Sequence, residues 1–241
     1  MYAIGDVHGR LDLFEHLRDA IEREIAAAPR VSSTVILLGD LVDRGPDSAG
    51  VIAAARAWRE RRKLHILLGN HEEMFLRSLT ETDVLRQFLR HGGRETLLSY
   101  GIPREAYASA TLPEIQQLAR ETLPAEDLEF IAGFEEMIAI GDYVFVHAGV
   151  LPEVPLDEQK STDLRWIREP FLSSDADHGG VVVHGHTIAD RPVVRANRIG
   201  VDTGAYRTGR LTALVLEGTR RNLLEALDAN GAITVSSREA E

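Results

Sequence analysis

The sequence predicts an α/β fold in which a β-sandwich of two mixed sheets is flanked by helices, with a helical insert. In the first third of the chain, short β-branched runs alternate with segments of helical periodicity, which is typical of a mostly parallel sheet with crossover helices. In the second half, a series of short strands separated by turn residues indicates a second sheet. Several strands end abruptly in glycine and a polar residue, as expected where a site forms at a sheet edge.

The N-terminal part contains three expected strands and two expected helices. Apolar runs predict buried strands at residues 2–4, 35–38 and 64–68. After the first strand, residues 11–28 place Leu13 and Leu17 at helical spacing, and Pro29 marks the end of that helix. A second helix is expected over residues 48–61. Together these elements form a βαβ core.

Residues 72–135 differ in composition and residue pattern from the rest of the chain. Leu, Arg and Glu dominate this segment, and it shows no strand pattern. Helices are expected within it at residues 84–91, 94–100 and 113–121. Gly92, Gly93 and Gly101 separate these helices. The segment either covers the sheet as a helical layer or forms a side wall of a site.

The second half contains a series of short expected strands. They lie at residues 137–140, 143–146, 181–183, 193–195, 199–201 and 211–216. Gly141 and Asp142 predict a hairpin turn between the first two. Because these strands follow the βαβ half, we expect them to build a second sheet packed on the first. Beyond about residue 228 the pattern is weak, and we expect this segment to fray.

Composition and charge limit the classes of protein to consider. The length and a composition of 44% hydrophobic and 27% charged residues predict one globular domain, residues 1–241. The net charge of −11 argues against nucleic-acid and membrane-surface binding. The absence of cysteine excludes disulfides, thiolate zinc sites and a cysteine nucleophile. With no leader pattern and no apolar stretch of roughly 18 residues, a cytoplasmic location is expected.

Five apolar runs end at residues that are typical metal ligands. The candidates are Asp6, His8, Asp40, Asn70, His147 and His186. All of them offer oxygen or nitrogen, which suits Mn²⁺, Fe and Zn²⁺. Six ligands are too many for one catalytic ion that keeps an open position, and they suit two ions. Asp40, at the end of a central strand, is then the candidate to bridge both ions.

Each candidate taken alone has a simpler structural explanation. An Asp that follows Gly at a strand end is often a turn or helix-capping residue. A His in an apolar run is more often a core residue, and we assign His65 and His184 to that class. His16, His91 and His178 lack a comparable context and are expected at the surface. The metal site is therefore inferred from the whole set.

Five motifs occur along the chain in the order GDVHG, GDLVDRGPDS, GNHE, VHAG and HGHT. In this order they resemble the metallophosphoesterase (calcineurin-like) superfamily, and within it the bacterial and phage-type phosphoprotein (Ser/Thr) phosphatase branch. The motifs extend from Gly5 to Thr187, and residues 201–205 (VDTGA) add a further match. The long GDLVDRG element and the ordered set carry the resemblance, since GNHE alone is a weak signal.

The resemblance implies two sets of metal ligands. The first ion corresponds to Asp6, His8 and Asp40. The second ion corresponds to Asp40, Asn70, His147 and His186. Because members of the family usually use Mn²⁺, the resemblance implies Mn²⁺ ions. Fe or Zn²⁺ is also compatible with the donors.

The resemblance also implies roles in phosphate binding and proton transfer. Arg44 and Arg168 correspond to the arginines that bind the phosphate. Arg165 remains an alternative to Arg168, because 25 of the 27 basic residues are Arg and any single Arg is weak evidence. His71 corresponds to the general acid, and Asp43 to the carboxylate that orients it.

These correspondences imply a metal-dependent phosphomonoesterase of the Ser/Thr protein phosphatase type. Members of the family form no phosphoenzyme; a metal-bound hydroxide attacks phosphorus in line, and the leaving oxygen is protonated. The expected substrate is a phosphorylated protein or a small phosphoester. Residues 72–135 are then a candidate wall of the substrate site.

Symmetrical dinucleoside tetraphosphatases of the same superfamily share most of these motifs and are the alternative. Members of that branch tend to lack the acid at the position of Asp43, to read GNHD in place of GNHE, and to carry an aromatic residue after the final GH. The present sequence has Asp43, Glu72 and Thr187 at these positions, which favours the phosphatase. A more remote alternative is a non-catalytic phosphate-binding module, which intact His71, Asp43 and Arg44 argue against.

Overall fold

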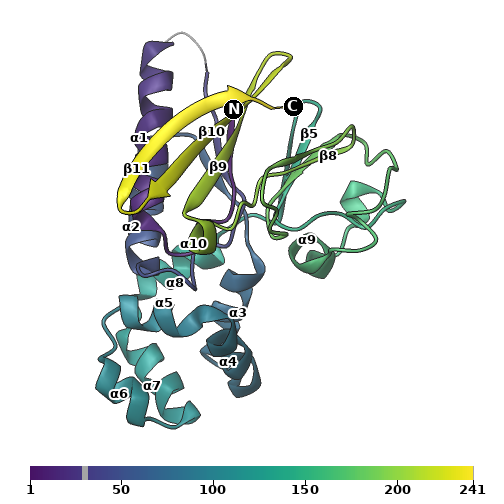
Figure 1. Ribbon diagram of the computed structural model, residues 1–241. Coiled ribbons are helices and arrows are strands. Elements are labelled where there is room, and N and C mark those ends of the chain that lie inside the picture. Colours follow the sequence, from purple (N-terminus) through teal and green to yellow (C-terminus); the bar gives the residue numbers. More distant parts are fainter. Residues whose placement is uncertain (29–31, 241) are drawn as a thin grey trace.

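Two mixed sheets form the centre of the computed structural model, which describes residues 1–28 and 32–240 (Figure 1). The first sheet has the spatial order β11 (Ala232–Glu239), β10 (Arg220–Ala229), β9 (Arg210–Glu217), β1 (Tyr2–Ile4), β2 (Val35–Leu37) and β3 (Leu64–Ile66). The second has the order β4 (Met137–Ile140), β5 (Tyr143–Val146), β6 (Val181–His184), β8 (Arg198–Gly200) and β7 (Val193–Val194). The predicted fold class is confirmed.

Parallel strands in each sheet direct several connections to the same edge. In the first sheet β1, β2 and β3 are parallel, and Ile4, Leu37 and Ile66 lie in register. The crossover helices α1 (Leu11–Ala27) and α2 (Ser48–Arg59) join them. In the second sheet β5, β6 and β8 are also parallel. The residues after these strands therefore leave both sheets at their carboxyl ends, where sites form in α/β folds.

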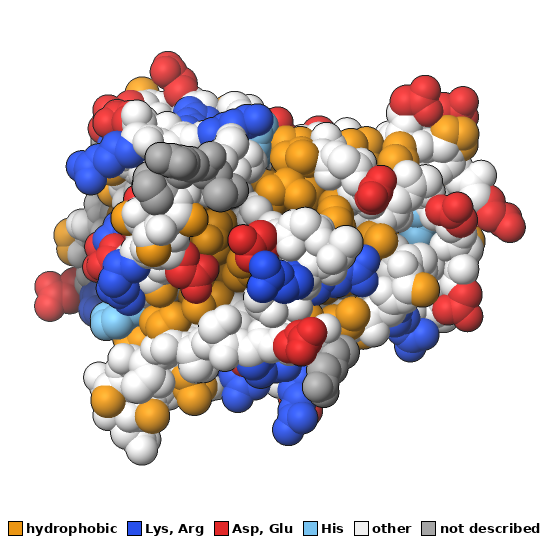
Figure 2. Space-filling view, turned by 90° about the horizontal axis from the view of Figure 1, so that it is seen from above, with side chains coloured by type: hydrophobic (Ala, Val, Ile, Leu, Met, Phe, Trp, Pro, Cys, Tyr) orange, Lys and Arg blue, Asp and Glu red, His pale blue; other side chains and the backbone are white. Residues whose placement is uncertain are grey.

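Apolar side chains fill the layers on both sides of the first sheet. On the outer side, α1 buries Leu13 and Leu17 completely against it. Between the two sheets, Ile36 packs in one cluster with Phe145 and Val183. Because the central strands of the first sheet are covered on both faces, their sequences are continuous apolar runs without alternation. Hydrophobic side chains also lie across the middle of the face opposite α6 and α7, among charged groups (Figure 2).

A helical segment lies between β3 of the first sheet and β4 of the second along the chain. It consists of α3 (Asn70–Ser78), α4 (Thr82–Phe88), the π-helical turn η1 (Leu89–Gly93), α5 (Arg94–Ser99), α6 (Arg104–Ser109), α7 (Leu112–Thr122) and α8 (Ala125–Ala132). The expected breaks occur at Gly92 (φ 106°) and Gly101 (φ 94°). The segment starts and ends at one place, because Leu68 N donates to Glu135 O and Glu135 N to Ile66 O, each at 2.8 Å.

The expectation that the chain frays beyond about residue 228 is wrong. β10 and β11 form a long hairpin at the edge of the first sheet, with Ala229 paired to Ala232. Asn230 (φ 56°) and Gly231 (φ 90°) make the two-residue turn, which suits these residue types because both positions need a positive φ. The pattern is weak because β11 is an edge strand on which only Ile233 and Val235 pack against the core.

Short helical elements in the second half were not predicted from the sequence. They are the 3₁₀ turn η2 (Leu156–Glu158), α9 (Ser161–Trp166) and α10 (Ala205–Thr208). Each is too short to show helical periodicity in its apolar residues. Within residues 1–28 and 32–240, no helix combines the length and the apolar content that a membrane crossing requires.

Candidate metal centre

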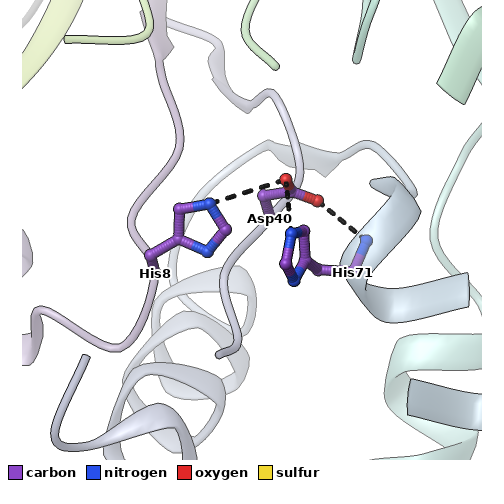
Figure 3. A group of neighbouring side chains, drawn as sticks. All are labelled: His8, Asp40 and His71. Atoms are coloured by element: carbon purple, nitrogen blue, oxygen red, sulfur yellow. Dashed lines mark hydrogen bonds and ion pairs between the residues drawn. The ribbon is translucent and has the colours of Figure 1, made fainter. Parts of the chain in front are cut away.

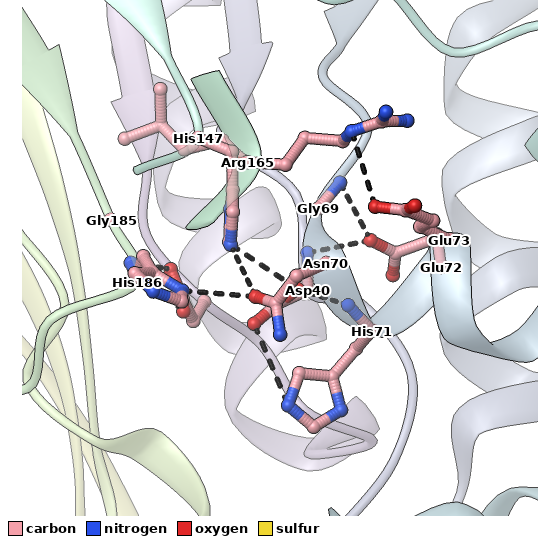
Figure 4. A network of polar contacts seen from close by, with 12 residues as sticks. Asp40, Gly69, Asn70, His71, Glu72, Glu73, His147, Arg165, Gly185 and His186 are labelled. Carbon is pink, nitrogen blue, oxygen red and sulfur yellow. Dashed lines mark hydrogen bonds and ion pairs between the residues drawn. The ribbon is translucent and has the colours of Figure 1, made fainter. Parts of the chain in front are cut away.

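Strand ends from both sheets bring the predicted metal ligands together at one buried place (Figure 4). In chain order they come after β1, β2, β3, β5 and β6 and are Asp6 and His8, then Asp40, Asn70, His147 and His186. None of these side chains is more than 7% exposed. The convergence expected from the sequence is therefore present. The roles of the six residues as ligands remain a proposal, which their geometry must support.

The backbone at this place is unusual. Seven residues other than glycine have a positive φ in the described chain, and five of them belong to the predicted site: His8, Asp40, Asp43, Arg44 and His186. A left-handed conformation is unfavourable for residues with a Cβ, and such residues cluster at functional sites. Gly39 (φ 95°) also has a left-handed conformation, and a Cβ there would in addition lie 2.8 Å from Gly69 N, so glycine is required at this position.

One group of donors consists of Asp40, Asn70, His147 and His186. The Nδ1 atom of His147 lies 2.7 Å from the carbonyl oxygen of Leu38 and must donate to it, so Nε2 carries a lone pair. This Nε2 atom faces Asn70 Oδ1 at 3.0 Å and Asp40 Oδ1 at 3.4 Å. His186 Nδ1 lies 2.9 Å from the same Asn70 oxygen. The lone pairs of His147 Nε2, Asn70 Oδ1 and Asp40 Oδ1 converge and repel one another unless a cation lies among them, so these donors fit a metal ion.

A second group lies on the other side of Asp40 and contains His8 and His71 (Figure 3). The Nδ1 atom of His8 donates to Val42 O at 2.8 Å, which leaves a lone pair on Nε2, 3.6 Å from Asp40 Oδ2. His71 Nε2 is 3.9 Å from the same oxygen. Asp40 therefore faces both groups, as a bridging carboxylate must.

Asp6 lies beside these groups and accepts hydrogen bonds from the backbone of His186. Both of its carboxylate oxygens accept from His186 N at 3.1 Å. Burial, together with the carboxylates of Asp202 and Asp40, raises the pKa of Asp6 well above its ordinary value. Several carboxyl groups buried this close together need a compensating positive charge, which is a further indication that the site suits cations.

His71 and Asp43 form a buried pair. His71 Nδ1 lies 2.6 Å from Asp43 Oδ2, and Thr96 Oγ1 donates to the other oxygen of Asp43 at 2.6 Å. Burial lowers the pKa of an imidazole, but Asp40 and Asp43 outweigh it here and hold the pKa of His71 above its ordinary value. Thr96 comes from α5, and no motif in the sequence pointed to it.

The two candidate phosphate-binding arginines line a cavity of about 100 Å³ in front of the donors. Arg44 donates to Nε2 of His8 at 2.7 Å and to Nε2 of His71 at 2.9 Å. Arg168 is exposed and has no ion pair with any residue that the structure describes. Arg165, the alternative, lies 3.3 Å from Glu73 and 3.5 Å from Glu136. Its charge is thus already compensated, which favours Arg168.

Glu72 is the residue of this site whose role the sequence did not reveal. Its side chain is fully buried. Its carboxylate accepts from the backbone N–H groups of Asp40 (2.9 Å), Leu41 (2.7 Å), Val42 (3.3 Å) and Gly69 (3.0 Å). These bonds hold the loop that carries Asp40. In the sequence Glu72 served only to distinguish two branches of a family.

The other histidines have mixed outcomes. His184 is a buried core residue, as expected, with its ring 5.1 Å from that of Phe171. His178 was expected at the surface and is buried, because Phe171 and Asn197 pack around it. His91 is exposed as expected, yet it lines the cavity beside His71.

Tyr206 is a further side chain that lies beside the donors. It comes directly after the VDTGA match and lies in the first turn of α10. Its ring centroid lies 5.3 Å from that of His8 and 4.8 Å from the guanidinium carbon of Arg44. Tyr206 therefore supports the ring of a predicted ligand and the side chain of a predicted phosphate-binding arginine.

Comparisons with known proteins identify the family of the chain. The family model of the calcineurin-like phosphoesterases matches residues 1–211. Serine/threonine-protein phosphatase 1 of Salmonella typhimurium is 29% identical over 221 residues, covering 88% of this chain and 89% of its own. A symmetrical bis(5'-nucleosyl)-tetraphosphatase of Nitrosospira multiformis is 24% identical over 269 residues, covering 90% and 92%. The crystal structure of a putative diadenosine tetraphosphatase superimposes with a TM-score of 0.60 at 21% identity, over 98% of this chain and 92% of that one.

The substitution Glu72→Gln tests whether the buried carboxylate maintains the metal centre. The amide nitrogen of Gln would face backbone N–H donors, so the loop should shift and Mn²⁺ affinity should fall about 10- to 100-fold. Isothermal titration with Mn²⁺ measures this, with circular dichroism to confirm folding. Glu73→Gln is the matched control, because Glu73 lies on the same turn of α3 but does not bond the loop. Unchanged affinity in folded Glu72→Gln would contradict this role.

Proposed function

Because this chain belongs to the calcineurin-like phosphoesterase family, we propose that it is a metal-dependent phosphomonoesterase of the Ser/Thr protein phosphatase type. The observation that carries the proposal is the buried His71–Asp43 pair beside two groups of metal donors that share Asp40. An acid, its orienting carboxylate and two cation sites are the parts that phosphate ester hydrolysis needs. A cytoplasmic location, expected from the sequence, remains a prediction.

In this proposal two divalent ions lie on the two sides of Asp40, and His71, although it lies close to His8 and Asp40, serves as the acid and not as a ligand. Asp6, His8 and Asp40 would hold one ion, and Asp40, Asn70, His147 and His186 the other. When bound, such ions activate a water molecule at neutral pH and stabilise negative charge on the phosphoryl group. The donors are all nitrogen and oxygen, which is compatible with Mn²⁺, our proposal, and with Fe or Zn²⁺.

The remaining residues bind the phosphate and move a proton. Arg44 and Arg168 line the same cavity, and a guanidinium group can bind two phosphate oxygens at once. A phosphate dianion would attract Arg44 more strongly than the two imidazoles that it contacts in this structure. Nε2 of His71 would then be free to carry a proton to the leaving oxygen. Asp43 fixes the opposite nitrogen and stabilises the imidazolium form.

The class of substrate rests on finer features. The pairing of Asp43 with His71 and the presence of Glu72 support a phosphoprotein, because the resemblance associates both with the phosphatase branch. The alternative is a symmetrical dinucleoside tetraphosphatase, which the Nitrosospira relative keeps open. A non-catalytic module is disfavoured, since the acid pair and Arg44 are intact.

Initial rates on two substrates decide between these classes. With Mn²⁺ present, a phosphoserine/phosphothreonine peptide and diadenosine tetraphosphate are compared side by side. We expect the peptide to have the higher kcat/KM, because the cavity offers two arginines, which suit a single phosphoryl group. A preference for the dinucleotide would contradict the protein phosphatase and favour nucleotide hydrolysis.

The substitution His71→Asn tests the proposed acid. We expect kcat on an alkyl phosphate to fall roughly 100-fold or more. The loss on nitrophenyl phosphate should be smaller, because that leaving group hardly needs a proton. Bound metal, measured by elemental analysis, should stay, whereas Asp40→Asn should lose it. Near-normal turnover of alkyl phosphates by His71→Asn would disprove the acid role.

Paired substitutions of Arg168 and Arg165 test which of them binds phosphate. Arg168→Ala should lower kcat/KM roughly 10-fold or more, as expected for loss of a charged hydrogen bond. Arg165→Ala should have a much smaller effect, because Glu73 and Glu136 already compensate its charge. Steady-state kinetics and inhibition by inorganic phosphate measure both. A larger effect at Arg165 would reverse the assignment.

A further inference from the structure

Trp166 is exposed at the mouth of the cavity. Its side chain is 38% exposed, and among the described residues it is the large hydrophobic side chain classed as exposed. It ends α9 and lines the same cavity as Asp40, Arg44 and Arg168. Because the ring lines this cavity, a ligand bound there would remove apolar surface of the indole from water, which is favourable. Its position on the cavity lining therefore makes Trp166 a candidate contact for a bound substrate.

Hydrogen bonds hold the ring in place. The indole Nε1 of Trp166 donates to Glu73 Oε2 at 2.8 Å. Glu73 in turn lies 3.3 Å from Arg165 Nε and 3.1 Å from Arg77 Nη1. This arrangement fixes the indole before any ligand arrives. Binding to a fixed ring loses little conformational entropy, so the site is preorganised.

The surroundings of Trp166 indicate what would cover the ring. The cavity is also lined by Met74 and His91, so a thioether and a second aromatic ring line it together with the indole. Sulfur and ring faces pack favourably against a planar group. Arg44 and Arg168, both on the cavity lining, match one phosphoryl group. A chain of several phosphates would meet Arg165 only after breaking its two ion pairs.

We propose that Trp166 is a specificity-determining residue that receives an aromatic side chain next to the phosphorylated residue of a peptide substrate. This inference rests on the proposed function and specifies its substrate class. The phosphoryl group occupies the arginines, and the neighbouring ring packs on the indole. Trp166 takes no part in proton transfer, so its contribution should appear in KM.

Two phosphoserine peptides that differ only in a Phe or an Ala beside the phosphoserine test the proposal. Wild-type protein with Mn²⁺ should favour the Phe peptide by about fivefold or more in kcat/KM, mainly through KM. Trp166→Phe keeps a ring without the indole N–H and should keep most of this ratio. Trp166→Leu keeps apolar bulk without a ring and should bring the ratio close to one.

Each outcome separates the two proposals. An unchanged Phe-to-Ala ratio in Trp166→Leu would overturn the role of Trp166. A ratio lost equally in Trp166→Phe would show that the bond to Glu73, and not the ring, matters, which also overturns it. If wild-type protein turns over neither peptide, the proposed function fails. If Trp166→Leu instead loses activity only on diadenosine tetraphosphate, the ring serves a nucleobase and the peptide assignment is wrong.

Tryptophan fluorescence gives a direct reading of binding. The chain has two tryptophans, and Trp58 is buried with its Nε1 bonded to Glu22 at 2.8 Å. A change in emission on binding should therefore come from Trp166. A phosphonate analogue of the Phe peptide, which is not hydrolysed, should change the emission of wild-type protein and not that of Trp166→Phe. Saturating binding without any change in wild-type emission would contradict the proposed contact.

Discussion

The carboxylate of Glu72 accepts hydrogen bonds from four backbone N–H groups, and the proposed metal centre depends on the loop that they hold in place. Asp40 and, a few residues on, Asp43 and Arg44 have left-handed backbone conformations. Each left-handed residue costs of order 1 kcal/mol or more of conformational free energy, and this conformation persists only where the surrounding structure enforces it. Glu72 supplies that enforcement for Asp40 from the first turn of α3, where the helix dipole favours a negative charge. The backbone N–H of Asp43 donates instead to Ser48 and Thr96, and that of Arg44 to Gly92 O. The proposed bridging ligand therefore depends on Glu72, and the proposed acid pair begins three residues further along the same loop.

Much of the fold and of the ligand set could be predicted from the sequence, and the reason is physical. Central strands that are buried on both faces consist of short apolar runs, so β1, β2 and β3 can be recognised in the sequence. Parallel strands place the residues after their carboxyl ends at one edge of the sheet. Once the runs are located, the convergence of Asp6, Asp40 and Asn70 follows from the parallel order of β1, β2 and β3. Helix α1 was equally visible, because one face is apolar along its whole length.

The features that escaped prediction depend on contacts between distant residues or on weak local patterns. Thr96 bonds Asp43 across 53 positions of sequence, and nothing near either residue indicates this contact. His178 is buried by neighbours that become adjacent only in the folded chain. β11 lies at a sheet edge, where few side chains need to be apolar, although Asn230 and Gly231 form a recognisable hairpin turn.

The closure between Leu68 and Glu135 has a consequence for how such a protein can change. The chain departs from the first sheet and returns to it at hydrogen-bonded neighbours, so the residues between them can lengthen or shorten without moving either end. Loop entropy rises only slowly with length and hardly opposes such changes. The catalytic edge and the outer helices are thus free to diversify separately. Recombination at this junction could exchange one set of outer helices for another while the strands stay in register.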